Sequence, residues 1–315
     1  MAIFEITYAR LSINRDSMKD IFYKLLIALS KRVGLWVFRF MAWFVATGYF
    51  ILFPGRVAVS VYFYKALFPR RGRLYYLWCA WRQFHNFTHV YMDRILLLDE
   101  KNIKITHEGW NYLEDAVDRG IGGIILMSHV GSWEIAAHSL RIRGRNNPRM
   151  KLLLYLGQKH KDQIERTQKE DLIQSGVKII VVEEEGGTPT DIVEGINFLK
   201  EGGLVSLTGD RLWRKDQRSV PVRFLGHKAF LPETPFVFAL LSGTPLYIFF
   251  AFRTGKQTYH FQNLSPEYVR ANNRTDRQEA ISRAAQAYAD HLEEKVRLHP
   301  FEWFHFEPFL GRRLD

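Results

Sequence analysis

The sequence predicts an α/β fold, in which helices flank a mixed, mostly parallel sheet and an aromatic-rich helical region precedes it. Beyond about residue 103, short β-branched apolar runs alternate with segments of helical periodicity, which is the order of strands joined by crossover helices. Residues 1–100 carry helical patterns dense in aromatic side chains and few strand signals. We therefore predict two regions, 1–100 and 101–315, with a soft boundary near Glu100.

The individual elements follow from local patterns. We predict strands at 103–106, 123–128, 151–155, 177–182, 204–207 and 246–252. Helices are predicted at 112–119, 161–174 and 191–200. Thr275 to Gln278 has the form of a capping box, which predicts a last helix from there to about Leu298. A chain of 315 residues with 47% hydrophobic content is long enough to bury a substantial core.

One short motif concentrates the candidate chemistry. His129 and Glu134 follow directly after the predicted strand at 123–128, and a helix is expected to begin near Ser132. In open α/β sheets ligands bind at the carboxyl ends of the strands, and a helix that starts there offers free backbone amides. An imidazole beside a carboxylate is a general-base pair. We predict His129 and Glu134 as catalytic residues and the amides near Gly131 and Ser132 as oxyanion donors.

The alternative is a histidine that only makes structural hydrogen bonds at a strand end. Spacing alone does not separate the two interpretations, because His160 and Glu165 stand at the same separation. That second pair lies in a charged segment without a preceding strand, so we assign it no role.

Four segments in order resemble one family: ITHEGWNYLEDAVDRGIGGIILMSHVGSWEIAAHSLR, GGLVSLTGDR, VRFLGHKAFLPETPFVFALLSGTPLYIFF and HPFEWFHFEPF. They look like the bacterial lipid A biosynthesis (lauroyl/myristoyl) acyltransferases, within the glycerolipid acyltransferase superfamily and its HxxxxD/E motif. The resemblance implies transfer of a fatty acyl chain from a thioester of acyl carrier protein or coenzyme A to a hydroxyl of a membrane lipid. The expected acceptor is a lipid A precursor, as in lipopolysaccharide biosynthesis, and the expected place is the cytoplasmic face of the bacterial inner membrane.

The resemblance also suggests substrate-binding residues. Asp210 ends a predicted strand on the same edge as His129 and matches the family's acidic position, but Arg211 follows it where DxD or DQ is common. Arg166 is the candidate for a further family arginine, and Lys169 aligns almost as well. We expect the basic segment 209–226 to be a functional loop that binds phosphate groups. The alternative is a solvated basic loop.

Charge and aromatic content favour a lipid partner. The net charge of +11 fits nucleic acid, an anionic membrane surface or an acidic carrier protein. Aromatic clusters in the first ninety positions suit a lipid interface better than a phosphate groove, so we expect no nucleic acid. Residues 36–53 approach the length of a bilayer span, but Arg39 interrupts them, so we predict a short anchor or embedded helix. A buried core helix is the alternative, and a cleavable signal peptide is not expected.

Other chemistries lack their motifs. The single cysteine, Cys79, is predicted to be a packed core thiol, and the sequence contains no GxSxG, HExxH or Walker A pattern. We therefore expect no metal and no cofactor. In the predicted mechanism His129 deprotonates the acceptor hydroxyl while Glu134 orients the ring. The acyl chain is expected to enter an apolar cleft lined by residues 235–241 and by the aromatic N-terminal region. Other hydroxylated lipids, such as a lysophospholipid or a glycolipid, are alternative acceptors. A non-catalytic, membrane-peripheral lipid-binding protein and a basic nucleic-acid-binding protein are the alternatives of other classes.

Overall fold

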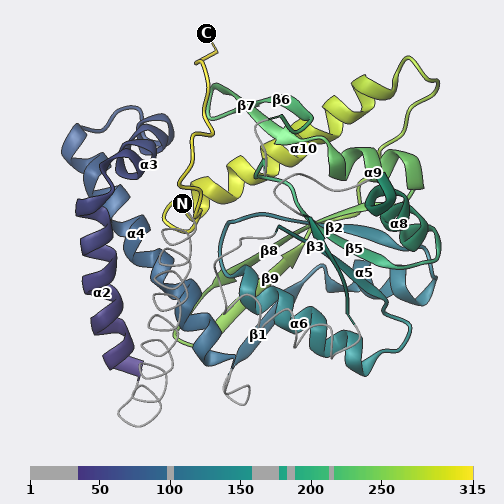
Figure 1. Cartoon of the computed structure of the whole chain (residues 1–315), viewed down its shortest axis with the longest axis horizontal. Coiled ribbons are helices and arrows are strands. Elements are labelled where there is room, and N and C mark those ends of the chain that lie inside the picture. Colours follow the sequence, from purple (N-terminus) through teal and green to yellow (C-terminus); the bar gives the residue numbers. More distant parts are fainter. Residues whose placement is uncertain (1–34, 98–102, 158–176, 183–188, 213–215, 315) are drawn as a thin grey trace, which may run out of the picture.

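A seven-stranded sheet forms the centre of the protein (Figure 1). The computed structural model describes residues 35–97, 103–157, 177–182, 189–212 and 216–314. The strand order is β1-β9-β8-β2-β5-β3-β4, and every neighbouring pair is parallel except β8 with β9. The predicted α/β fold with a mixed, mostly parallel sheet is therefore confirmed.

The strands are short and largely buried. Their bounds are β1 Lys104–Glu108, β2 Gly123–Met127, β3 Leu152–Gly157, β4 Lys178–Val182, β5 Leu204–Thr208, β8 Leu246–Arg253 and β9 Thr258–Asn263. A separate antiparallel hairpin consists of β6 Ser219–Phe224 and β7 His227–Pro232. The six predicted strands correspond to β1, β2, β3, β4, β5 and β8. Of these, β2, β3, β4, β5 and β8 are mostly apolar runs, as expected in a sheet covered on both faces, whereas β1 at the sheet edge is mostly exposed.

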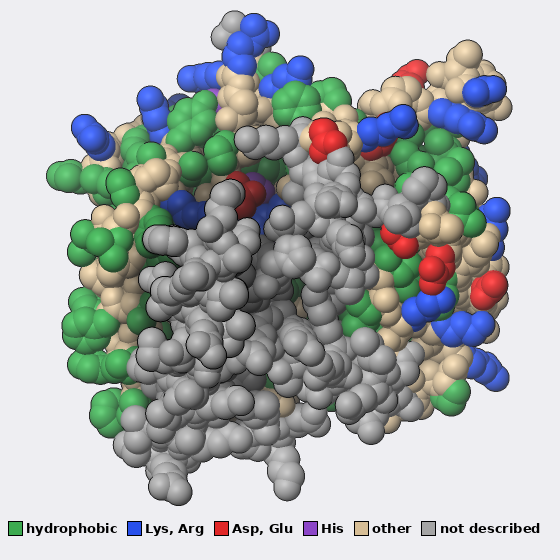
Figure 2. Space-filling model, in the orientation of Figure 1, with side chains coloured by type: hydrophobic (Ala, Val, Ile, Leu, Met, Phe, Trp, Pro, Cys, Tyr) green, Lys and Arg blue, Asp and Glu red, His purple; other side chains and the backbone are tan. Residues whose placement is uncertain are grey.

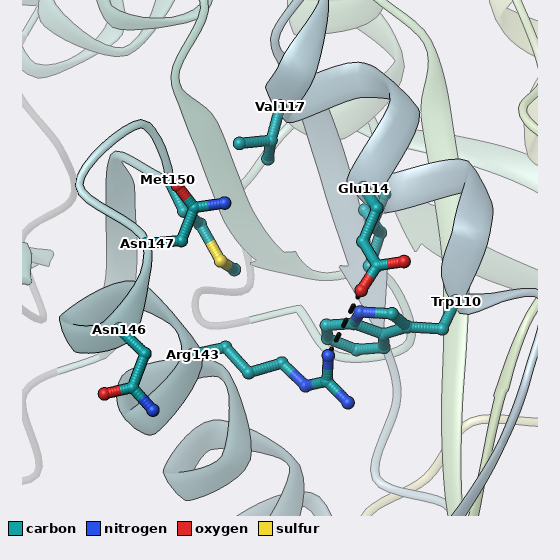
Figure 3. Close-up of a pocket in the computed structure, with 8 residues that line it drawn as sticks. Trp110, Glu114, Val117, Arg143, Asn146, Asn147 and Met150 are labelled. Atoms are coloured by element: carbon teal, nitrogen blue, oxygen red, sulfur yellow. Dashed lines mark hydrogen bonds and ion pairs between the residues drawn. The ribbon is translucent and has the colours of Figure 1, made fainter.

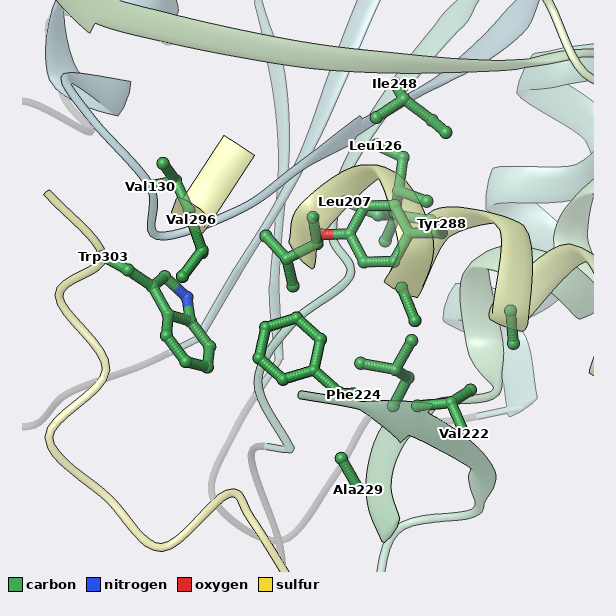
Figure 4. Close-up of a cluster of buried hydrophobic side chains, with 14 of the residues drawn as sticks. Leu126, Val130, Leu207, Val222, Phe224, Ala229, Ile248, Tyr288, Val296 and Trp303 are labelled. Carbon is green, nitrogen blue, oxygen red and sulfur yellow. The ribbon is translucent and has the colours of Figure 1, made fainter. Parts of the chain in front are cut away.

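Helices cover both faces of the sheet. On one face lie α5 (Trp110–Asp118) and α6 (Trp133–Asn146), whose apolar side chains share a buried cluster with the strands. On the other face lie α9 (Thr234–Ser242) and α10 (Arg277–Leu298), with α8 (Pro189–Lys200) beside α9. Figure 4 shows Leu126, Leu207 and Ile248 of the sheet meeting Tyr288 of α10 and Phe224 of β6 in the larger core cluster.

Three local predictions were wrong or incomplete. The segment 209–226, expected as one loop, contains β6, and the strands β7 and β9 were missed. The capping box at Thr275 does not form, since the Thr275 hydroxyl donates to Oδ1 of Asn273 and the residue before α10 is Asp276. Asn273 Oδ1 also accepts the amide of Asp276 at 3.0 Å, so a turn within the loop takes the groups that a cap would use. The predicted helix 161–174 lies outside the described residues.

The N-terminal part of the described chain is helical, as predicted. Helices α2 (Leu35–Leu52) and α3 (Pro54–Leu67) both pack against α4 (Arg73–Leu96), in which Cys79 is buried. Within the described residues no single helix is long and apolar enough to span a membrane. Only α2 and α3 taken together satisfy length and composition, and they meet at a bend of 91°.

Helix α2 is not a buried core helix. Its exposed large side chains are Trp36, Phe40, Trp43, Phe44, Val45, Tyr49, Ile51 and Leu52. They form much of the edge of the molecule at the left of Figure 2, over the position of α2 in Figure 1. The alternative of a buried core helix is therefore wrong for α2, whereas the predicted membrane contact and the division at residue 100 remain predictions.

Candidate active site

His129 stands in a turn between β2 and α6, at the carboxyl edge of the sheet where the sequence placed it. The turn is pinned by main-chain hydrogen bonds from two other parts of the chain. Phe304 N donates to His129 O at 2.9 Å, and Gly131 N donates to Glu302 O at 2.8 Å. Ser132 N donates to Ala251 O of β8 at 2.6 Å. The backbone around the imidazole is therefore fixed by the C-terminal segment and by β8.

The His129 ring contacts a carboxylate, and that carboxylate is Asp210. Nδ1 of His129 lies 2.8 Å from Oδ1 of Asp210, and the His129 main-chain amide donates to Oδ2 at 2.7 Å. The Asp210 side chain is fully buried, while 13% of the His129 side chain is exposed. Asp210 follows β5, the neighbour of β2, so two adjacent parallel strands deliver the two residues to one edge.

Asp210 is held in its charged form. Burial alone would raise the pKa of this carboxyl, but His129 and the indole of Trp303 hold it well below its usual range. Trp303 Nε1 donates to Oδ2 at 3.0 Å. An ionised carboxylate only accepts hydrogen bonds, so Nδ1 of His129 is the donor and Nε2 is the nitrogen that can take up a proton.

The structure thus gives Asp210 a closer relation to His129 than predicted. We expected Asp210 to bind substrate and Glu134 to orient the ring. The backbone of Glu134 lies in the first turn of α6, but its side chain is outside the described part, so its role stays a prediction.

The two oxyanion candidates are engaged elsewhere. The amides of Gly131 and Ser132 donate to the carbonyls of Glu302 and Ala251, so neither is available to bind an oxyanion in this structure. Gly131 has a φ of +78°, and a Cβ there would lie 2.0 Å from Ala251 O. The glycine is therefore required for the close approach of the turn to β8, rather than for binding substrate.

The structure describes only some of the basic residues that were predicted to bind substrate. Arg211 is half-buried, its Nε has no partner among the described residues, and its charge helps to lower the pKa of His305. Arg166, Lys169, Arg214 and Lys215 lie outside the described residues. Arg223 belongs to β6. Its main-chain N–H donates to the Gln286 side chain in α10, and that side chain donates back to its carbonyl oxygen. Arg223 is therefore part of a hairpin and not of a long phosphate-binding loop.

The sequence reasoning missed the contribution of the C-terminal segment. Trp303 is fully buried, and Gln83 of α4 donates to its carbonyl at 2.6 Å. His305 lies against the rings of Trp303 and Phe309. Burial, with Arg211 and His129 nearby, lowers the pKa of His305 to about 4, so the ring is neutral at physiological pH. The signal is present in the motif HPFEWFHFEPF, but the sequence alone assigns no role to its individual residues.

A cavity of about 330 Å³ lies away from this site, between α5 and the end of α6 (Figure 3). Its lining residues are Trp110, Leu113, Glu114, Val117, Arg143, Asn146, Asn147 and Met150, which include none of the candidate site residues. The segment expected to line an acyl cleft forms α9, whose side chains Phe236 and Phe238 fill the core. Within the described residues no group of three or more histidine, cysteine or acidic side chains is placed to hold a metal ion.

Comparison with protein families gives the site its context. Residues 83–310 match the model described as bacterial lipid A biosynthesis acyltransferase, a span that includes His129, Asp210 and Trp303. The chain belongs to this family. The protein is therefore an acyltransferase of lipid A biosynthesis, and the predicted resemblance is confirmed. A comparison with curated protein sequences gave no match.

Proposed function

We propose that this acyltransferase moves a fatty acyl chain from a thioester of acyl carrier protein or coenzyme A to a hydroxyl of a lipid A precursor. The observation that carries the proposal is the contact of His129 with Asp210 at the carboxyl edge of the sheet, inside the segment that matches the family. A histidine held in one tautomer by a buried carboxylate is equipped to act as a general base.

The mechanism follows from the orientation of the ring. His129 Nε2 removes the proton of the acceptor hydroxyl, and the oxygen attacks the carbonyl carbon of the thioester. The tetrahedral intermediate collapses as its C–S bond breaks, and the imidazolium returns the proton to the departing sulfur. The products are an ester and a free thiol, with no acyl-enzyme. We assign the orienting role to Asp210, because its carboxylate occupies Nδ1.

The developing oxyanion requires donors other than Gly131 and Ser132. Helix α6 begins at Trp133, immediately after the turn, and the first-turn amides of any α-helix have no partner within the helix. We assign the oxyanion to the amino end of α6, where the helix dipole also favours negative charge. Removal of a donor of this kind typically costs about 10²–10³ in rate.

We further propose that α2 and α3 bring the site to the cytoplasmic surface of the inner membrane. The exposed apolar side chains of α2 are followed by exposed Arg56, Arg70, Arg71 and Arg73. Apolar side chains beside basic ones suit the boundary between acyl chains and anionic headgroups. Sedimentation with anionic vesicles tests this. Phe40→Ser/Phe44→Ser/Leu52→Ser should reduce binding, whereas Leu241→Ser/Tyr268→Ser/Leu298→Ser, exposed on other elements, should not.

The reaction itself is tested by mass spectrometry of lipids. Purified wild-type and His129→Ala protein are incubated with acyl carrier protein or coenzyme A thioesters and a mixed bacterial lipid extract. A mass increase of one acyl chain on a lipid A precursor, seen only with wild type, is the expected result. An increase on a lysophospholipid or glycolipid would replace the proposed acceptor. No increase that depends on His129, in folded protein, would refute the catalytic assignment.

A further inference from the structure

A second buried charged cluster adjoins the His129 turn and has no part in the mechanism above. Arg253 of β8 donates through Nη2 to Oδ1 of Asp93 in α4. Tyr259 of β9 donates its hydroxyl to the same oxygen at 2.7 Å and accepts from Arg253 Nη2 at 2.9 Å. The side chain of Asp93 is 1% exposed and that of Arg253 is 11% exposed. Helix α4 and strands β8 and β9 therefore each contribute one charged or polar side chain to this buried cluster.

Stability is a poor explanation for this cluster. Two of its atoms, Oδ2 of Asp93 and Nε of Arg253, are buried and have no hydrogen-bond partner among the described residues. Burial raises the pKa of the Asp93 carboxyl, although Arg253 and Tyr259 act to lower it. A buried ion pair with incomplete hydrogen bonding is often no more stable than apolar side chains of the same volume. The cluster therefore has the features of a polar network kept for a purpose other than stability.

The cluster reaches the His129 turn through Ser132. The Ser132 hydroxyl makes no capping hydrogen bond to α6, and it helps to lower the pKa of the Asp93 carboxyl. The Ser132 amide donates a hydrogen bond to the carbonyl oxygen of Ala251, which lies two positions before Arg253 on the same strand. Helix α4 also packs directly against α6. The main chain of Ser132 is thus held by the strand that carries Arg253, and α4, which carries Asp93, packs against the helix that Ser132 precedes.

We propose that Asp93 and Arg253 are positioning residues, which act through Ser132 to hold the start of α6 at the orientation that catalysis requires. The proposal rests on the proposed function, in which the first amides of α6 receive the oxyanion beside His129. The cluster makes no contact with substrate in this scheme. Its effect is on the placement of the helix end, where small displacements of hydrogen-bond donors have large effects on rate.

The matched pair Ser132→Thr and Ser132→Val tests the proposal. Both substitutions add the same bulk, but only threonine keeps the hydroxyl. We expect Ser132→Val to lower kcat about 10–100-fold relative to Ser132→Thr, with KM for the thioester changed less than about 3-fold. Thr244→Val, a buried threonine at the opposite end of β8, is the control and should retain wild-type kcat. Equal kcat for the two Ser132 variants, or a loss confined to KM, would overturn the proposal.

Asp93→Asn extends the test to the cluster. Combined with Ser132→Val, it should lower kcat no further than the larger single effect, because in the proposed scheme both substitutions act on the start of α6 through Ser132. Effects that multiply would refute the connection. Thermal unfolding of each variant shows whether it is folded at the assay temperature.

A measurement without turnover separates this proposal from the proposed function. Exchange of the hydrogen-bonded amides of Gly131, Ser132 and Ala136 should be faster in Asp93→Asn than in wild type and unchanged in Thr244→Val. Unchanged exchange in folded Asp93→Asn would refute the positioning role even if transfer occurs. Faster exchange in a protein that transfers no acyl group would leave the positioning role standing and refute the function.

Discussion

Trp303 donates its indole N–H to Oδ2 of Asp210 at 3.0 Å, across 93 positions of sequence. Asp210 in turn contacts the His129 ring through its other oxygen. The tryptophan is fully buried against Phe63, Phe224 and its C-terminal neighbours. The C-terminal motif is therefore a structural part of the sheet edge that carries His129, because Trp303, packed in the core, holds the carboxylate that contacts the imidazole.

The first prediction concerns which carboxylate serves His129. Asp210→Asn should lower kcat about 10²–10⁴-fold, because the amide no longer stabilises the imidazolium and can favour the wrong tautomer. We expect KM for the thioester to change little, since Asp210 is fully buried. Steady-state kinetics with a defined thioester and acceptor checks this, with Asp290→Asn on the exposed side of α10 as the control.

The comparison with Glu134→Gln decides between the two assignments. If Asp210 orients the ring, its loss should be at least as severe as the loss of Glu134. A Glu134→Gln variant that is inactive beside a nearly normal Asp210→Asn variant would restore Glu134 as the orienting residue and leave Asp210 a substrate-binding or structural one.

The second prediction concerns the indole hydrogen bond. Trp303→Phe keeps an aromatic ring but removes the donor to a buried charge, so we expect the free energy of unfolding to fall by about 1.5–3 kcal/mol. Trp110→Phe is a matched control, because Trp110 is also buried but its Nε1 has no partner among the described residues. Urea unfolding should show a smaller loss for Trp110→Phe. Equal losses would mean that ring volume, not the hydrogen bond, is what matters at Trp303.

Much of the sheet followed from sequence because its central strands are continuous apolar runs. Strand β2 has the sequence GIILM and lies in the middle of the sheet, so a strand that is apolar in sequence is also buried in the structure. The strands that were missed carry weaker signals. Strand β6 contains Pro221, which argues against a strand, and it is tolerated because β6 belongs to a two-stranded hairpin. In β9, TYHFQN, buried residues alternate with polar ones, a pattern too short to stand out.

Sequence predicted only those site residues whose structural setting is formed by neighbouring residues in the chain. His129 could be placed because a strand and the start of a helix flank it directly. The hydrogen-bond partners of its ring and main chain come from elsewhere, namely Asp210 and Phe304, and of these the sequence singles out only Asp210. Glu134 could be proposed because it lies only five positions from His129 in the sequence. That β5 lies beside β2 cannot be read from the sequence, because it depends on the order of the strands in the sheet.

The third prediction uses two glycines with similar backbone angles. Gly131 and Gly226 have φ values of +78° and +74°, but a Cβ would lie 2.0 Å from Ala251 O at the first and within 4 Å of nothing at the second. Gly226→Ala should cost only the left-handed strain of about 1–2 kcal/mol. Gly131→Ala adds a clash with backbone that must displace the His129 turn, so we expect a larger loss of stability and at least a 10-fold fall in kcat. Similar stability and activity for the two variants would show that the turn is free to move away from β8.

The fourth prediction concerns the dependence of stability on pH. The folded protein keeps His305 neutral down to about pH 4, whereas the unfolded chain protonates a histidine near 6.5. Between these values the unfolded state binds the additional proton, so the free energy of unfolding rises as the pH increases from about 4 to 6.5 and gains nothing more from this residue above that. The contribution is on the order of 3 kcal/mol over the whole interval.

His305→Gln isolates this contribution. Urea unfolding of wild type and variant between pH 4 and 7 should give a shallower rise for the variant. His89 in α4 provides an independent comparison, because burial and the charges of Arg253 and Arg39 lower its pKa to about 4 as well. His89→Gln should reduce the rise separately, and the double variant should reduce it by the sum, since the two histidines sit on different elements. An unchanged slope in His305→Gln would mean that His305 binds its proton over the same pH range in the folded and the unfolded protein, and would refute the lowered pKa.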